Sequence, residues 1–150
     1  MEPFDQNAIA GVGPLGPAVD RTGVEIRQAS ADRVVGTMPV AGNTQSYGML
    51  HGGVSCVLAE TLGTMAAALH AGPRRRAVGV EINATHHRPA VAGTITGTAT
   101  PLHRGDTLAT YRIVLTDDAG RTVCTARLTC LIRDLDSAAG GPGGGEISAR

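Results

Sequence analysis

The pattern of apolar and polar positions divides the chain into one helical segment and several segments with a period of two. Apolar and β-branched residues alternate with polar ones after Pro73, in residues 77–85, 94–102, 107–116 and 122–133. Two shorter segments of the same kind, 24–26 and 33–40, come earlier in the chain. Between the two groups, apolar side chains recur every three or four residues from Val54 to Leu69, which is typical of a helix.

This order of elements predicts an α+β fold in which an antiparallel sheet wraps around one long central helix. Pro39 ends the second strand because proline cannot donate to a sheet ladder, and Gly72–Pro73 ends the helix. Residues 117–120 indicate a hairpin turn between the last two strands. The helix is apolar nearly all round, so we expect it to be buried on nearly all sides.

The two ends of the chain differ in composition from the segment between them. Residues 1–17 are rich in Gly and Pro and predict a flexible arm, with a short helix around residues 4–10. Residues 137–150 contain a run of glycines and few apolar residues, which predicts a disordered tail. The working domain is therefore expected to span residues 18–136, and 150 residues suit one domain.

Composition and charge exclude several classes of function. Thirteen basic and thirteen acidic residues give zero net charge, which removes a bulk electrostatic case for nucleic acid or an anionic membrane. The three cysteines form no C-x-x-C pair, which argues against a disulfide framework or a zinc site. The chain start lacks the profile of a signal peptide, and Glu60 and several threonines interrupt the longest apolar stretch. We expect a soluble, cytoplasmic protein without a metal or cofactor.

Candidate chemistry gathers at the start of the predicted helix. Gly52 and Gly53 leave backbone N–H groups uncovered at a helix N-terminus, where the partial positive charge favours an oxygen anion. Such an arrangement can serve as an oxyanion hole, although two glycines also permit a simple tight turn. His51 is placed to cap the helix or to fix the loop, and Gln45 alone is a polar loop residue.

Glu60 stands in the middle of the apolar helix. A buried carboxylate costs several kcal/mol unless it is paired or faces a cavity, and burial would raise its pKa towards that of a base. The alternatives are a solvated edge of the helix or a structural pair. Thr64 lies one turn further along on the same side, so the two side chains are placed to hold one water.

Taken together, these residues resemble the motif of the hotdog-fold thioesterases. The resemblance is closest to the phenylacetic-acid-pathway and 4-hydroxybenzoyl-CoA thioesterase branch, which carries an acid on the central helix. The matching positions are Gln45, Gly48, His51, Gly52, Gly53, Glu60 and Thr64, with Arg88–Pro89 and residues 117–121 in support. The resemblance runs from about residue 19 to residue 133.

The resemblance implies a role for each matching residue. Glu60 would be the nucleophile or general base, the Gly52 amide would hold the oxyanion, and Gln45 would place the thioester. His51 would orient the loop and the thiol leaving group, and Thr64 would position water or the carboxylate. The site would form across the interface of a homodimer, and dimers of dimers (homotetramers) are common in this family. The implied substrate is the thioester of a small, aromatic acyl group, with medium-chain acyl groups as the alternative, carried on coenzyme A or on a carrier protein.

Further residues are candidates for substrate binding. Gly53 belongs to the same loop, and Tyr47 is expected either to shape the acyl pocket or to pack. Arg88 resembles a coenzyme A phosphate contact, with a solvated arginine at a strand end as the alternative. Thr107 stands where the family contacts the nucleotide, but the neighbouring Asp106 would repel a phosphate.

Two other groups are less suited to chemistry. His86 and His87 are adjacent on a predicted strand and point to opposite faces, so they are poor joint metal ligands. Cys56 is interpreted as a small buried hydrophobe, because no activating base is placed with it.

Two functions outside the thioesterases stay open on the sequence alone. One is a non-catalytic hotdog domain that binds acyl-CoA or mediates oligomerisation, and the other is a hotdog hydratase or dehydratase. A mere binder has no evident need for a carboxylate in an apolar helix, and the hydratases place their acid or histidine differently. Glu60 followed by Thr64 therefore favours hydrolysis.

Overall fold

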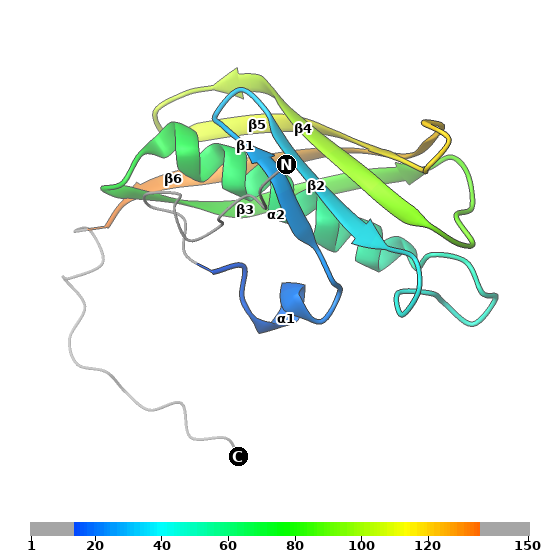
Figure 1. Cartoon of the computed structure of the whole chain (residues 1–150). Coiled ribbons are helices and arrows are strands. Elements are labelled where there is room, and N and C mark those ends of the chain that lie inside the picture. Colours follow the sequence, from blue (N-terminus) through cyan, green and yellow to red (C-terminus); the bar gives the residue numbers. More distant parts are fainter. Residues whose placement is uncertain (1–13, 136–150) are drawn as a thin grey trace, which may run out of the picture.

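The computed structural model describes residues 14–135 as six strands and two helices (Figure 1). In chain order the elements are α1 (Pro17–Asp20), β1 (Glu25–Ala29), β2 (Val34–Pro39), α2 (Gly52–Ala71), β3 (Arg75–His86), β4 (Thr94–Arg104), β5 (Leu108–Thr116) and β6 (Thr122–Asp134). The helix predicted around residues 4–10 and the tail 137–150 lie outside the described residues.

All strand pairs are antiparallel, and the strands form one sheet in the order β1-β2-β4-β5-β6-β3. The predicted order of two strands, one helix and four strands is confirmed, and with it the α+β fold with a sheet around one helix. β1 and β3 are the two edge strands. The pairing of β3 with β6 is interrupted once, because Val80 is an extra residue that forms a bulge between Gly79 and Glu81.

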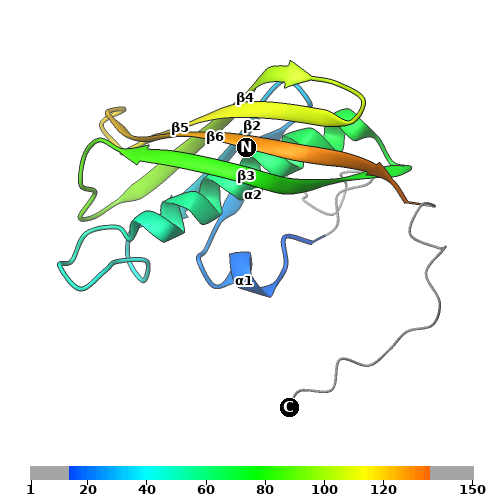
Figure 2. The same cartoon turned by 180° about the vertical axis from the view of Figure 1, so that it is seen from behind.

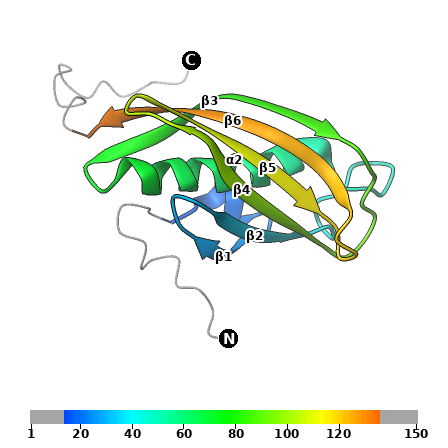
Figure 3. The ribbon, with the colours of Figure 1, turned by 90° about the horizontal axis from the view of Figure 1, so that it is seen from above.

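The sheet curves around α2. Figure 1 shows β1 and β2 in front of the helix, and the opposite view in Figure 2 shows β3 in front of it. From above, β4, β5 and β6 cross over the helix (Figure 3). α1 lies on the side of α2 that faces away from the sheet (Figures 1 and 2).

The core is aliphatic and fills the space between α2 and the concave face of the sheet. Leu58 and Leu62 of α2 are fully buried there, together with Tyr111 of β5. The Tyr111 hydroxyl donates a hydrogen bond to the Ala66 carbonyl of α2 at 3.1 Å. Burial raises the pKa of Tyr111 to about 12, so this donor keeps its proton at neutral pH. The bond ties α2 to the sheet about two turns after Glu60.

The structure departs from the sequence prediction in how much of α2 is covered. Only one side of the helix packs on the sheet, and the side that carries Glu60 is open in the single chain. The prediction of a helix buried on nearly all sides is therefore wrong for one chain. Its length and apolar composition would also suit a membrane span, but its contacts are those of a core helix.

Smaller differences concern the elements near the chain start. β1 continues to Ala29, beyond the segment 24–26 that the sequence predicts, and a bulge lies between Ile26 and Gln28. The sequence pattern does not predict α1, because four residues are too few for a periodic pattern. Leu15 and Val19 also pack against the core.

Candidate active site

The loop between β2 and α2 is held in place by a buried asparagine. The Asn43 side-chain Nδ2 donates to the carbonyls of Thr22 at 2.7 Å and Pro39 at 2.8 Å. Its own carbonyl accepts from the His51 amide at 2.9 Å. The Leu50 amide in turn donates to the Ala90 carbonyl at 2.7 Å, which ties the end of the loop to the β3–β4 connection. The start of α2 is therefore fixed on a well-anchored loop.

His51 is the N-cap of α2, as the sequence allowed. Its imidazole Nδ1 accepts the Gly53 amide at 2.9 Å, and its carbonyl accepts the Val54 and Ser55 amides at 3.0 and 3.2 Å. In the first turn of α2, among the described residues, the Gly52 amide alone has no hydrogen-bond partner. His51 thus leaves one N–H free at the positive end of a 20-residue helix.

His86 lies directly against Gly52, a placement that the sequence did not predict. A Cβ atom at Gly52 would come within 2.8 Å of the His86 Nε2 atom, so the imidazole packs on the glycine. His86 also lines a cleft of about 270 Å3 with Ser55 and Arg88. The sequence pattern raises His86 only as a metal ligand beside His87. Its position at the end of a strand that runs antiparallel to the helix is the signal that points to the helix start.

Glu60 lines a larger cleft on the open side of α2. The cleft has a volume of about 460 Å3 and is also bounded by Thr64. Glu60 is exposed in the single chain and forms no hydrogen bond or ion pair with any described residue. The expectation that its carboxylate is buried is therefore wrong for one chain, because Glu60 lies at the margin of the sheet, beside the edge strand β3, and no further strand covers it there.

Two contacts define the surroundings of the Glu60 carboxylate and of Thr64. A Cβ atom at Gly79 of β3 would come within 2.9 Å of the Glu60 Oε1 atom, so the carboxylate lies against the β3 backbone. The Thr64 hydroxyl is 4.0 Å from the Cys130 thiol of β6. The structure thus brings Glu60 and Thr64 to one cleft, as their spacing predicts.

Gly52 and Glu60 of one chain are too far apart to act on the same carbonyl group. Eight residues along an α-helix correspond to a rise of about 12 Å. The N–H groups of the first turn point away from the helix, so an oxygen held by Gly52 would lie still further from Glu60. A nucleophile must approach within about 3.5 Å of the carbonyl carbon. The two groups can therefore act on one carbonyl group only if they come from different chains.

Gln45 and Tyr47 lie in the anchored loop. The Gly48 amide donates to the Gln45 carbonyl at 2.9 Å in a tight turn, and Gly48 has a φ of 77°, which favours glycine. The Gln45 side-chain oxygen accepts weakly from the Tyr47 amide at 3.4 Å. The Tyr47 side chain is 84% exposed. Both side chains are available to a molecule on the outer side of the loop, and their roles stay predictions.

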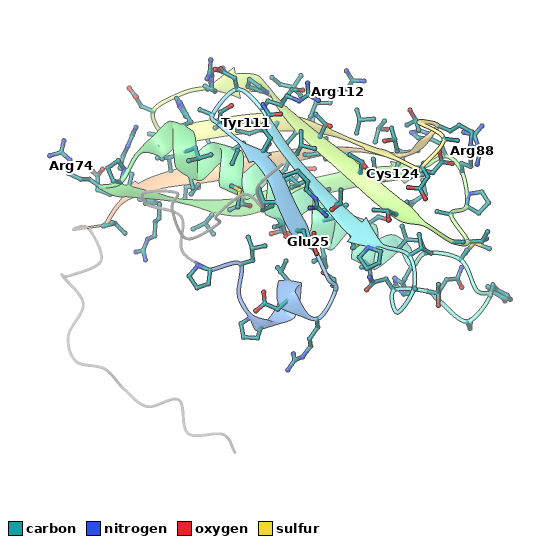
Figure 4. The ribbon with its side chains drawn as sticks, viewed as in Figure 1. Glu25, Arg74, Arg88, Tyr111, Arg112 and Cys124 are labelled. Carbon is teal, nitrogen blue, oxygen red and sulfur yellow. The ribbon has the colours of Figure 1, made fainter. Side chains whose placement is uncertain are left out.

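Arg88 and Thr107 lie at opposite ends of the molecule. Arg88 follows β3 and donates to the Thr122 carbonyl at 3.3 Å, whereas Thr107 lies beside Arg75 at the start of β3. Figure 4 shows the two ends by the labels Arg74 and Arg88. The length of β3 separates them by about 35 Å. If both contact nucleotides, they contact different nucleotides or belong to different chains.

The cysteines are poorly suited to nucleophilic chemistry. Burial, and secondarily the nearby Glu60 charge, raises the pKa of Cys56 above its ordinary value. Burial also raises the pKa of Cys124, labelled in Figure 4, to about 11. The thiolate, which is the reactive form, is therefore scarce at neutral pH. This agrees with the interpretation of Cys56 as a small packing residue.

The chain is similar to known proteins both in sequence and in structure. The sequence model of the thioesterase superfamily matches residues 47–124. The proofreading thioesterase EntH of Cronobacter turicensis is 41% identical over 119 residues, which cover 79% of this chain and 87% of the relative. The crystal structure of the thioesterase HI1161 from Haemophilus influenzae has a TM-score of 0.77 and 37% identity, covering 80% of this chain and 85% of that one.

A third relative, SAV0944 from Staphylococcus aureus, has been solved as two alanine variants. The glutamate variant has a TM-score of 0.76 and 30% identity, covering 79% of this chain and 100% of that one. The glutamine variant, named as a thioesterase, has a TM-score of 0.75 and 29% identity, covering 77% of this chain and 98% of that one. The replaced glutamine and glutamate are fifteen residues apart, as Gln45 and Glu60 are here.

Proposed function

The chain belongs to the thioesterase superfamily and is a thioester hydrolase, and from this premise we propose that it is a cytoplasmic acyl-CoA thioesterase for small, aromatic acyl groups. It works as a homodimer or a dimer of dimers, and each active site combines residues of two chains. Glu60 of one chain is the nucleophile or general base. The Gly52 amide of the other chain holds the oxyanion.

The observation that carries the proposal is the single free amide at the start of α2. His51 occupies the other N–H groups of the first turn, so one donor remains for a ligand oxygen. An oxyanion donor of this kind stabilises a tetrahedral transition state by about 3 kcal/mol. The His86 imidazole packs on Gly52, and we infer that it contacts the same oxygen or the leaving sulfur.

Glu60 suits the attack on a thioester. A thioester carbonyl is reactive and its thiolate leaves readily, so a carboxylate can act on it without a Ser-His pair. The Glu60 side chain has no polar partner among the described residues and faces a cleft, which leaves it free to attack or to activate water. The S. aureus variants support this choice, because alanine replaces a glutamine and a glutamate at the spacing of Gln45 and Glu60.

The cleft beside Glu60 supports a small acyl group. Its volume of about 460 Å3 lies in the range of small-molecule sites. Most of the wall is apolar, from Leu15, Val19, Val57, Met65, Ala68 and Ala77. An apolar wall of this kind suits an uncharged acyl group with a ring or a short chain, because most of its residues carry no charge.

The edge strand β3 supports the homodimer. It is twelve residues long, one side of its backbone pairs with no strand of residues 14–135, and Val78 and Val80 are 50% and 55% exposed. A long apolar edge invites pairing with another chain unless it is blocked. Pairing with β3 of a second copy would cover these residues and supply the missing half of each site.

The contacts of α2 with β3 suggest the register of this pairing. Glu60 lies against Gly79 and Gly52 lies against His86, and both contact points face the helix. An antiparallel pairing with its two-fold axis at Asn83 sets the Gly79–Val80 bulge of one chain opposite His86 of the other. Glu60 of the first chain then lies beside Gly52 of the second, which is the pairing that catalysis requires.

Replacing Asn83 with cysteine tests this register. Two residues related by the axis lie about 5 Å apart, within the reach of a disulfide, so Asn83→Cys is expected to form a covalent dimer under mild oxidation. Glu81→Cys is the matched control, because its two copies would be about 13 Å apart. Non-reducing electrophoresis gives the readout. Equal cross-linking of both variants, or of neither, contradicts the register.

The proposed reaction is tested by following free thiol release from a panel of aryl- and alkyl-CoA thioesters. We expect turnover on aryl groups in preference to long alkyl chains. The name of the C. turicensis relative raises proofreading as a second use of the same chemistry. The same acyl groups on a phosphopantetheine carrier protein therefore form the second half of the panel. Absence of turnover on every thioester, from folded protein, contradicts the proposal.

A further inference from the structure

The Glu60 carboxylate contacts Gly79 of β3 on the side of α2 that is open in the single chain. Glu60 has no hydrogen-bond or ion-pair partner in the described chain, so polar contacts do not fix its rotamer. The side chain nevertheless lies so close to β3 that a Cβ at Gly79 would be 2.9 Å from Oε1 and 3.6 Å from the carboxyl carbon. The β3 backbone at Gly79 is therefore the wall on which the carboxylate lies.

The bulge beside Gly79 strengthens this interpretation. Val80 is the extra residue between Gly79 and Glu81, and the residues that face α2 change from Ala77 and Gly79 before it to Ile82 and Ala84 after it. A bulge redirects side chains locally and often lies next to an active site. Here the bulge begins at Gly79, the glycine that contacts Glu60. Among the residues of β3 that face α2, the one without a side chain therefore lies opposite the carboxylate.

We propose that Gly79, with the bulge at Val80, is the positioning residue for the Glu60 carboxylate. It admits the carboxylate against the strand and thereby sets its direction towards the thioester. This inference rests on the proposed role of Glu60. A Cβ at position 79 would push the carboxylate out into the cleft, although no group that touches substrate has been removed.

The test is a double-mutant cycle of Gly79→Ala with Glu60→Asp. We expect Gly79→Ala to lower kcat between about 10- and 100-fold, with KM nearly unchanged, because a shift of about 1 Å in a reacting group has effects of this size. The aspartate side chain of the Glu60→Asp variant is one methylene shorter, so its carboxylate avoids the new methyl group. In the Glu60→Asp background, the same Gly79→Ala change should therefore cost less than about threefold.

Gly36→Ala is the matched control. Gly36 of β2 also contacts α2, and its Cβ would lie 2.7 Å from Leu62 Cδ2, two residues from Glu60 but on the core side. It should lower the melting temperature and leave kcat nearly unchanged, whereas Gly79→Ala should lower kcat and leave the melting temperature nearly unchanged. Wild-type kcat in Gly79→Ala, or the same loss in both backgrounds, overturns the inference. Absence of thioester turnover in the wild type overturns the proposed function instead.

Discussion

Glu60→Gln is expected to reduce thioester hydrolysis by about 10²- to 10⁴-fold, the range found for removal of a general base. Glutamine has the same shape but can neither attack the carbonyl nor accept a proton from water. Because Glu60 has no hydrogen-bond or ion-pair partner among the described residues, the substitution should leave the melting temperature unchanged. Steady-state release of free thiol, with the best substrate of the CoA panel, gives kcat and KM.

Glu25→Gln provides the control for this substitution. Glu25, labelled in Figure 4, lies on β1 and forms an exposed ion pair with Arg27. Exposed pairs contribute at most about 1 kcal/mol to stability, and this pair lines neither cleft, so activity should stay at the wild-type level. A Glu60→Gln enzyme within a few-fold of wild type would remove Glu60 from the reaction.

Gly52→Pro is expected to lower kcat by about 10²- to 10³-fold, the effect of losing one oxyanion-hole donor. Proline removes the amide proton and is well tolerated in the first turn of a helix. The preceding His51 has a φ of −71° and a ψ of 127°, the extended conformation that a following proline requires. The substitution therefore deletes the donor while it preserves the helix start.

Gly52→Ala is the control that separates loss of the Gly52 N–H donor from crowding of His86. Alanine keeps the N–H but adds the Cβ that would meet His86 Nε2 at 2.8 Å, a contact that proline also makes. The further decrease in kcat from Gly52→Ala to Gly52→Pro measures the contribution of the amide donor. Equal rates for the two variants would mean that crowding of His86, rather than loss of the donor, impairs the enzyme.

The fold was accessible from the sequence because its elements are set by local patterns. Period-two segments predict the strands, and the apolar repeat from Val54 to Leu69 predicts the helix, since each pattern depends on neighbours a few residues away. The His51 cap was also predictable, because capping is a contact within one turn. The same reasoning extends to Glu60 and Thr64, which share a cleft because they are one helical turn apart.

The features that the sequence does not predict depend on contacts between segments that are far apart in the chain. The helix pattern does not say which side the sheet covers, so it predicts a buried Glu60, which is open in the single chain. The contacts of His86 with Gly52 and of Gly79 with Glu60 could not be predicted, because they arise only when β3 lies beside α2. The distance that separates Gly52 from Glu60 follows from the helix itself, but the proposal of a site shared by two chains also depends on the position of β3 at the edge of the sheet.

The most direct test of the shared site is complementation between two inactive variants. Glu60→Gln and Gly52→Pro chains with different tags are co-expressed, and the mixed dimer is isolated by sequential affinity steps. In that dimer one site joins an intact Gly52 amide to an intact Glu60, and the other site carries both defects. Thiol release at about half the wild-type rate per dimer is the predicted result, because one of two symmetric sites is restored. Activity no higher than that of either parent variant would contradict a site built from two chains.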